Sequence, residues 1–198
     1  MKKVITYTLL TFMLVFMGAM VVNPAGALTY QDETDVEFTF NSTLSLSLSS
    51  ASMMISDLTP GQSGTSNSIN VVVNTNNVYG YNLSATVGSS STDYRDLKHT
   101  NGTDAFSSIA VGSNVASLPT NGNSVWGFVK TTNGTTWSNY NGLPKYDDAV
   151  NTVQLNSSTG AAVDATTGFK IGAFAKAGQL AGDYSNVINF IAVANAGS

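Results

Sequence analysis

The chain has 198 residues, of which 42% are hydrophobic and only 10% are charged, and its formal net charge is −4. Because Lys and Arg are scarce, a basic surface stripe is excluded and nucleic acid is not expected as a partner. Cysteine is absent, so disulfides and thiolate metal ligands cannot hold the fold together, and core burial and strand pairing must do so.

The first predicted element is a secretory signal peptide covering residues 1–27. Two lysines precede the apolar run Val4–Val22, and the small residues Ala25 and Ala27 form an Ala-x-Ala cleavage site. We expect a signal helix that is removed after Ala27. The apolar run is also close to the shortest membrane-spanning length, so an uncleaved anchor is the alternative. In both cases the remaining chain is secreted or lies at the extracellular cell surface.

Residues 28–198 are predicted to form a single domain built from strands. Apolar and polar residues alternate with a period of two, which buries one face of a strand and leaves the other in water. The alternating segments are, in chain order, Val36–Phe40, Leu44–Leu48, Ile69–Val73, Tyr79–Val87, Val125–Val129, Val153–Leu155, Phe169–Ala175 and Tyr184–Val193.

Three local features accompany these strands. Asn76 and Asn77 predict a turn that joins the segments before and after it into a hairpin. Two neighbouring apolar residues, Val187 and Ile188, predict a bulge in the last strand. Between residues 88 and 124 the alternation weakens, so we expect an irregular insertion there, in the kind of segment that often carries binding surfaces.

Short strands joined by Gly, Asn and Ser turns predict an all-β fold. We expect an antiparallel β-sandwich with immunoglobulin-like or jelly-roll topology, and an open barrel is the alternative. After the signal segment, no long helical periodicity competes with this prediction.

The alternating stretch Phe38–Leu48 has two interpretations. The favoured one makes it the first strand or two of its own domain. In the other, the stretch inserts into the sheet of a neighbouring molecule, so that the protein assembles with itself.

The sequence predicts no catalytic residue, no metal ligand set and no cofactor. His99 is the only histidine, and we interpret it as a solvated loop residue. No Gly-x-Ser-x-Gly motif presents a nucleophile, and the neighbouring acids Asp147 and Asp148 are interpreted as loop residues rather than a catalytic pair. We therefore expect a protein that is not an enzyme.

Aromatic residues give the best candidate for a binding site. Trp126 lies in an alternating segment and is expected in the core. Trp137, Tyr140 and Tyr146 lie in a polar, irregular segment, and exposed aromatic rings there could stack on sugar rings while Asn and Asp side chains bind hydroxyl groups.

Several segments resemble those of exported bacterial surface proteins: Leu58–Gly61, Thr75–Tyr81, Val125–Phe128 and Ala181–Asn186. The last of these is similar to the Gly-x-Tyr pattern before the closing strand of WxL-type cell-wall proteins and of fimbrial or spore-coat-like domains. The resemblance to the WxL type implies peptidoglycan binding.

Together these observations predict an exported bacterial cell-surface protein with a structural or adhesive function. The alternative is a carbohydrate- or cell-wall-binding module that uses exposed aromatics. Expected partners are cell-wall polysaccharide or other surface proteins, with membrane contact only through the N-terminal segment.

Overall fold

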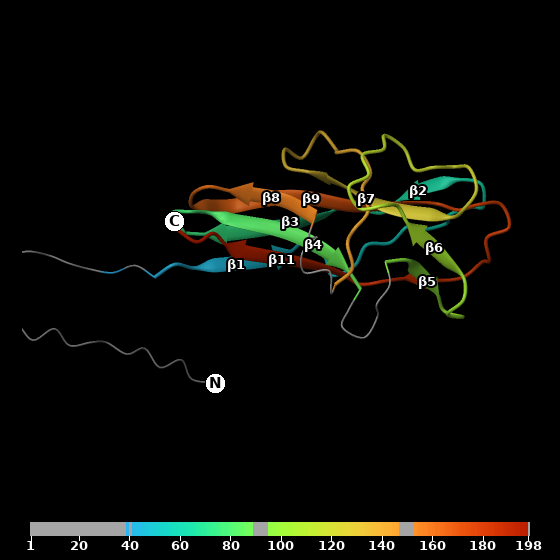
Figure 1. The fold of residues 1–198 in the computed structure, drawn as a ribbon, viewed down its shortest axis with the longest axis horizontal. Coiled ribbons are helices and arrows are strands. Elements are labelled where there is room, and N and C mark those ends of the chain that lie inside the picture. Colours follow the sequence, from blue (N-terminus) through green and yellow to red (C-terminus); the bar gives the residue numbers. More distant parts are fainter. Residues whose placement is uncertain (1–38, 40, 89–94, 147–152, 198) are drawn as a thin grey trace, which may run out of the picture. The chain divides into compact units, whose positions relative to one another are not determined.

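The computed structural model describes residues 39, 41–88, 95–146 and 153–197 (Figure 1). The predicted signal helix, its cleavage residues Ala25 and Ala27, and the predicted strand Val36–Phe40 except Thr39 lie outside these residues. Residues 40–198 form one structural unit, and its secondary structure, in the described parts, consists of strands. The predicted all-β class is thus confirmed. None of the described residues forms a helix long and apolar enough to cross a membrane.

The larger sheet contains eight strands. They are β1 (Leu44–Leu48), β2 (Ser63–Thr65), β3 (Ile69–Thr75), β5 (Leu97–His99), β6 (Ala105–Ser108), β7 (Val125–Thr131), β9 (Ala162–Phe174) and β10 (Tyr184–Ser185). Their hydrogen-bonded order is β1-β3-β9-β7-β6-β5-β10, and β2 pairs with β9. Since β6 runs parallel to β7, the expectation of an entirely antiparallel fold is wrong at this pair.

The smaller sheet contains β4 (Tyr81–Val87), β8 (Val153–Ser158) and β11 (Ile188–Ala194). Its order is β11-β4-β8, with antiparallel pairing on both sides of the central strand. In Figure 1 this sheet is recognised by green β4 between red β11 and orange β8.

Two predicted connections are corrected by the strand pairing. β3 and β4 do not form a hairpin, because β3 pairs with β1 and β9 whereas β4 belongs to the smaller sheet. The turn between them closes with a hydrogen bond from Gly80 N to Asn77 O, and it carries the chain from one sheet to the other. The predicted last strand is also divided, because β10 pairs with β5 and β11 pairs with β4. Alternation of apolar and polar residues indicates which face of a strand is buried, but it does not indicate with which neighbour that strand pairs.

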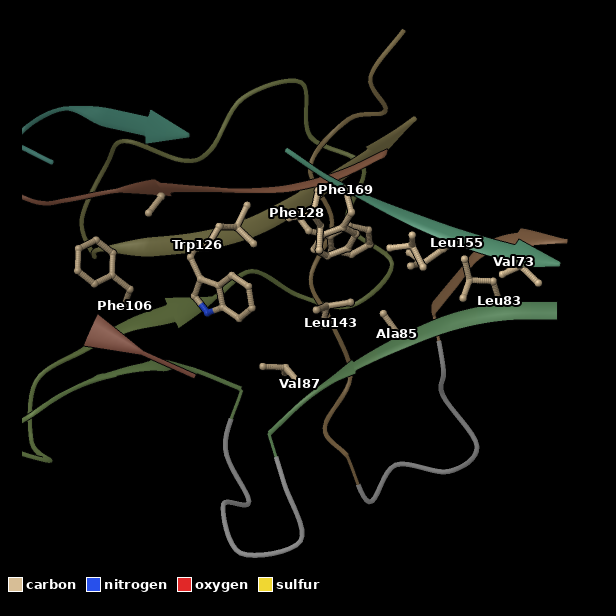
Figure 2. Packing of buried hydrophobic residues seen from close by; sticks show 14 of the residues in the cluster. Val73, Leu83, Ala85, Val87, Phe106, Trp126, Phe128, Leu143, Leu155 and Phe169 are labelled. Carbon is tan, nitrogen blue, oxygen red and sulfur yellow. The ribbon is translucent and has the colours of Figure 1, made fainter. Parts of the chain in front are cut away.

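The main hydrophobic core is shared by both sheets (Figure 2). Trp126 is 1% exposed, as expected for a core residue, and its Nε1 donates to Arg95 O at 3.0 Å. Phe169 stacks on Phe128 with centroids 5.1 Å apart and meets Phe190 of β11 edge-on at 5.0 Å. Such ring contacts add to the free energy gained from area burial alone, and the contact between Phe169 and Phe190 connects the two sheets.

A second, smaller cluster lies apart from this core. It contains Ile109, Leu118 and Phe174, with Val115, Val125 and Tyr140 packed against it. Alternation along β9 directs Phe169, Ile171 and Ala173 to the main core, so Gly168, Lys170 and Gly172 belong to the opposite face of the sheet. That outer face positions the candidate site.

Within residues 88–124, for which an irregular insertion was expected, the described part includes β5 and β6. His99 is half-buried on β5, with its ring 4.9 Å from that of Tyr184. Its Nδ1 accepts from Asn101 N, and its Nε2 lies 3.2 Å from Ala181 O. The interpretation of His99 as a solvated loop residue is therefore wrong, because the segment around it pairs into the larger sheet.

Candidate functional site

Trp137 lies on the outer face of the larger sheet, in the loop that follows β7. Ser138 fastens this loop to the end of β7, because its N donates to Lys130 O at 2.8 Å and its Oγ accepts from Lys130 N at 3.0 Å. The indole extends over Gly168 of β9, where an added Cβ would lie 3.4 Å from Trp137 Cη2 and only 2.7 Å from Thr131 Cγ2. A glycine at this position therefore makes room for the loop and for the ring.

Asn133 shapes the turn between β7 and Trp137. Its Oδ1 accepts hydrogen bonds from Thr131 Oγ1, Thr135 N and Thr136 N at 2.8, 3.1 and 2.9 Å. This use of an Asn side chain in place of a backbone acceptor is typical of tight loops. Its Nδ2 has no hydrogen-bond partner among the described residues, so that donor remains available on the loop surface.

Two hollows border Trp137. The first has a volume of about 260 Å³ and is lined by Lys130, Thr131, Thr132, Asn133, Thr136, Trp137 and Ser138. The second has a volume of about 360 Å³ and is lined by Ser68, Asn70, Thr131, Thr132, Asn133, Gly134, Trp137, Thr166 and Gly168. The second hollow therefore combines one aromatic ring with hydroxyl and amide groups, and its lining contains no charged residue.

Two lysines lie near this site, and the structure gives each a defined contact. Lys170 places its Nζ 4.2 Å from the centroid of the Trp137 ring, a cation–π contact that covers one face of the indole. Lys130 Nζ donates to the carbonyl oxygens of Gln154 and Leu155 on β8. Burial lowers the pKa of Lys130 below its ordinary value of 10.5. Lys130 thus serves to connect β7 to the smaller sheet.

Tyr140, a predicted site residue, also lies on the outer face of the larger sheet, but its ring is packed against the second cluster rather than exposed. Its ring lies against Gly172, where an added Cβ would be 2.5 Å from Tyr140 Cε1. Its backbone exchanges hydrogen bonds with Val115, and burial raises the pKa of its hydroxyl above 10.0. Tyr140 lines neither hollow, so its contacts are those of a packing residue in the second cluster.

Tyr146, the third predicted site residue, lies elsewhere. It is 44% exposed, and its N donates to Val87 O at the end of β4, in the smaller sheet. It lines neither hollow. The structure therefore does not bring the three aromatics into one platform, and of the three only Trp137 borders these two hollows. Asp147 and Asp148 are outside the described residues.

The residues that accompany Trp137 were not identified from the sequence. Ser68 and Asn70 come from the start of β3, and Thr166 and Gly168 come from β9, where Asn70 pairs with Gly168. The one signal available was the alternation Gly168-Lys170-Gly172, which leaves the outer face of β9 flat enough for a loop to lie on it. Among the described residues, no group of three or more His, Asp or Glu side chains is arranged to hold a metal ion.

Comparison of the chain with family models, with curated proteins and with solved structures gives no match.

Proposed function

We propose that this chain is an exported bacterial cell-surface protein with a structural or adhesive function, which binds neutral polysaccharide of the cell wall at Trp137 and catalyses no reaction. The observation that carries the proposal is the hollow of about 360 Å³ in which one half-buried indole faces an uncharged lining of amides and hydroxyls. The predicted signal segment and the resemblance of Ala181–Asn186 to WxL-type proteins support the location at the cell wall.

The chemistry of the hollow favours a polyol ligand. A sugar ring has an apolar face of C–H groups that can lie against an indole, and its hydroxyl groups both donate and accept hydrogen bonds. Lys170 covers one face of Trp137, so the sugar would contact the part of the indole that lines the hollow. The Asn133 Nδ2 and the side chains of Ser68 and Asn70 would bind hydroxyl groups.

We also propose that the two sheets form a two-layered sandwich of the immunoglobulin-like or jelly-roll kind. The shared core, with Phe169 of the larger sheet packed edge-on against Phe190 of the smaller one, supports this arrangement. A sandwich of this kind displays loops and outer faces without needing a disulfide, which suits a surface protein free of cysteine.

Retention of the exported protein on insoluble purified bacterial cell wall, chitin and cellulose tests the glycan site. We expect Trp137→Ala to lower retention on at least one of these materials by about tenfold or more, as for an aromatic residue that anchors an interface. Tyr146→Ala is the matched control, because it removes an exposed aromatic ring that borders neither hollow. Equal retention of Trp137→Ala and the unmodified protein would overturn the proposal.

A further inference from the structure

The first strand of the larger sheet has an apolar row that the domain leaves incompletely covered. β1 pairs with β3 in the register Leu44↔Thr75, Leu46↔Val73 and Leu48↔Val71. Val71, Val73 and Thr75 are buried, and residues opposite one another in a pair share a face, so the three leucines belong to the core side. They are nevertheless 36%, 37% and 44% exposed.

Among the described residues, no strand pairs with the outer backbone edge of β1. β1 is the last strand on its side of the larger sheet, and β11, which lies beside it, is one of the two edge strands of the smaller sheet. Edge strands are usually protected by charged residues, proline or bulges. β1 has the sequence Leu-Ser-Leu-Ser-Leu and pairs with β3 in unbroken register, so none of these devices is present in it.

We propose that Val36–Phe40 of one copy of this chain adds as a strand to the outer edge of β1 in a second copy. The two segments match in period and in number of apolar residues. Val36, Phe38 and Phe40 occupy alternate positions, as do the three leucines of β1. With Phe38 opposite Leu46, the phenylalanines cover the leucine row, and Glu37 and Thr39 lie beside Ser45 and Ser47 on the other face, where no like charges meet.

We assign the occupant to another copy, because residues 41–43 are held along the end of β3 and its turn rather than along the outer edge of β1. Asn76, just beyond the end of β3, holds the approach to β1: its Oδ1 accepts from Thr43 N at 2.6 Å and its Nδ2 donates to Asn41 O at 2.9 Å. Thr75 Oγ1 also donates to Thr43 O at 2.7 Å. Residues 41–43 therefore continue along β3 and its turn, and a reversal within them would break all three hydrogen bonds.

This inference does not depend on the glycan site, because β1 contributes no residue to either hollow. It assigns to Val36–Phe40 the role of an added strand and to Leu44–Leu48 the role of the receiving edge. Since each copy carries both parts, repeated addition would produce chains of molecules rather than closed dimers.

Disulfide trapping in the full chain tests the contact directly, because the protein has no cysteine of its own. Phe38 and Leu46 are each the central residue of a row of three, so they meet whether the added strand is parallel or antiparallel. We expect Phe38→Cys co-expressed with a differently tagged Leu46→Cys to give a disulfide-linked heterodimer after oxidation. Phe38→Cys with Ser47→Cys is the control and should give none, because Ser47 lies on the opposite face. Absence of the Phe38–Leu46 heterodimer would overturn the proposal, as would equal linking of Leu46→Cys to itself, which would indicate direct pairing of two β1 edges.

A mixing experiment provides the second readout. Phe38→Glu with Phe40→Glu removes the added strand, and Leu46→Glu removes the receiving edge. Each variant should be monomeric when alone, whereas a mixture of the two should give a dimer with one copy of each and no longer chains. Near-ultraviolet circular dichroism reports whether the core around Trp126 is intact in both. If folded variants formed no mixed dimer, or if the doubly substituted variant still dimerised with itself, the proposal would be wrong.

Discussion

Asn77 and Asn195, which are 118 positions apart, connect the turn after β3 to the chain that leaves β11. Asn77 Nδ2 donates to Asn195 O at 2.8 Å and to Gly80 O at 3.0 Å. Asn195 Nδ2 in turn donates to Tyr79 O at 2.7 Å and to Ser158 O at 3.0 Å. Two amide side chains thus hold together the turn that crosses between the sheets, the end of β8 and the C-terminal end of the smaller sheet.

Replacement of Asn77 should destabilise the domain strongly. Asn77 is buried, and Asn77→Ala removes the donor to Asn195 O as well as one of the two donors to Gly80 O, which still accepts from Asn195 N. Loss of a buried donor costs about 1–3 kcal/mol. Urea unfolding followed by Trp fluorescence measures the change. Asn70→Ala serves as the control for stability, because the Asn70 side chain is exposed and has no hydrogen-bond partner among the described residues. Equal unfolding midpoints for the two variants would contradict the proposed role of Asn77.

Gly172 should tolerate no side chain. An added Cβ would lie 2.5 Å from Tyr140 Cε1 and 2.7 Å from its hydroxyl oxygen, so Gly172→Ala must displace the ring from the second cluster. We expect a loss of about 1–3 kcal/mol in the free energy of unfolding, which is typical of overpacking. Gly160→Ala is the matched control, since its nearest neighbour, Val78 O, lies 4.0 Å from the added Cβ. A Gly172→Ala variant as stable as this control would show that Tyr140 is not packed as described.

The free energy of unfolding should fall as the pH rises above 10. Burial raises the pKa of Tyr81 and of Tyr140 above the ordinary 10.0, so the unfolded chain loses these protons first and the stability they contribute is lost as pH passes through their folded-state values. Lys130 has the opposite effect. Because burial lowers its pKa on folding, the folded chain loses this proton first, and the free energy of unfolding gains from Lys130 as the pH rises toward 10.5. Unfolding of Tyr81→Phe between pH 9 and 11, compared with the unmodified protein, checks the assignment. Tyr81→Phe should flatten the decline of stability with pH, and an unchanged slope would contradict the assignment.

Lys170 should influence Trp137 without being required for the fold. Its Nζ lies over the indole at 4.2 Å, and cation–π contacts at exposed sites are worth about 0.5–1 kcal/mol. We expect Lys170→Met to shift the emission of Trp137 while changing the free energy of unfolding by no more than about 1 kcal/mol. The same substitution combined with Trp137→Phe should leave the remaining Trp126 emission unaltered. A change in Trp126 emission would mean that Lys170 acts on the core.

The strands could be predicted from the sequence more fully than their pairing. Alternation located the segments that became β1, β3, β4, β7 and β11, because burial of one face imposes a period of two. The exchange between sheets at Asn77 and between Ser185 and Ile188 could not be predicted, since it depends on long-range hydrogen bonds such as Asn77 to Asn195. The parallel pairing of β6 with β7 could not be predicted either, because the residues of a strand do not indicate the direction of its neighbour.

Of the residues that form the candidate site, only the aromatic one, Trp137, was predicted from the sequence. Trp137 was identified because it lies in a polar segment, but nothing in its surroundings pointed to Ser68, Asn70 or Thr166, which reach the hollow from β3 and β9. Tyr140 has the same sequence context as Trp137. The Tyr140 ring differs in its surroundings, because it packs against the second cluster and Gly172. This packing depends on tertiary structure and could not be predicted from the local sequence.

The most direct measurement of the proposed function is a titration of the ¹⁵N-labelled exported protein with solubilised cell-wall polysaccharide, observed at the two indole Nε1–H resonances. Trp126 is buried and bonded to Arg95 O, so it is an internal control for Trp137. We predict that the Trp137 resonance shifts and saturates while the Trp126 resonance stays in place. If neither resonance moved while the protein still bound the polysaccharide, the Trp137 hollow would not be the binding site.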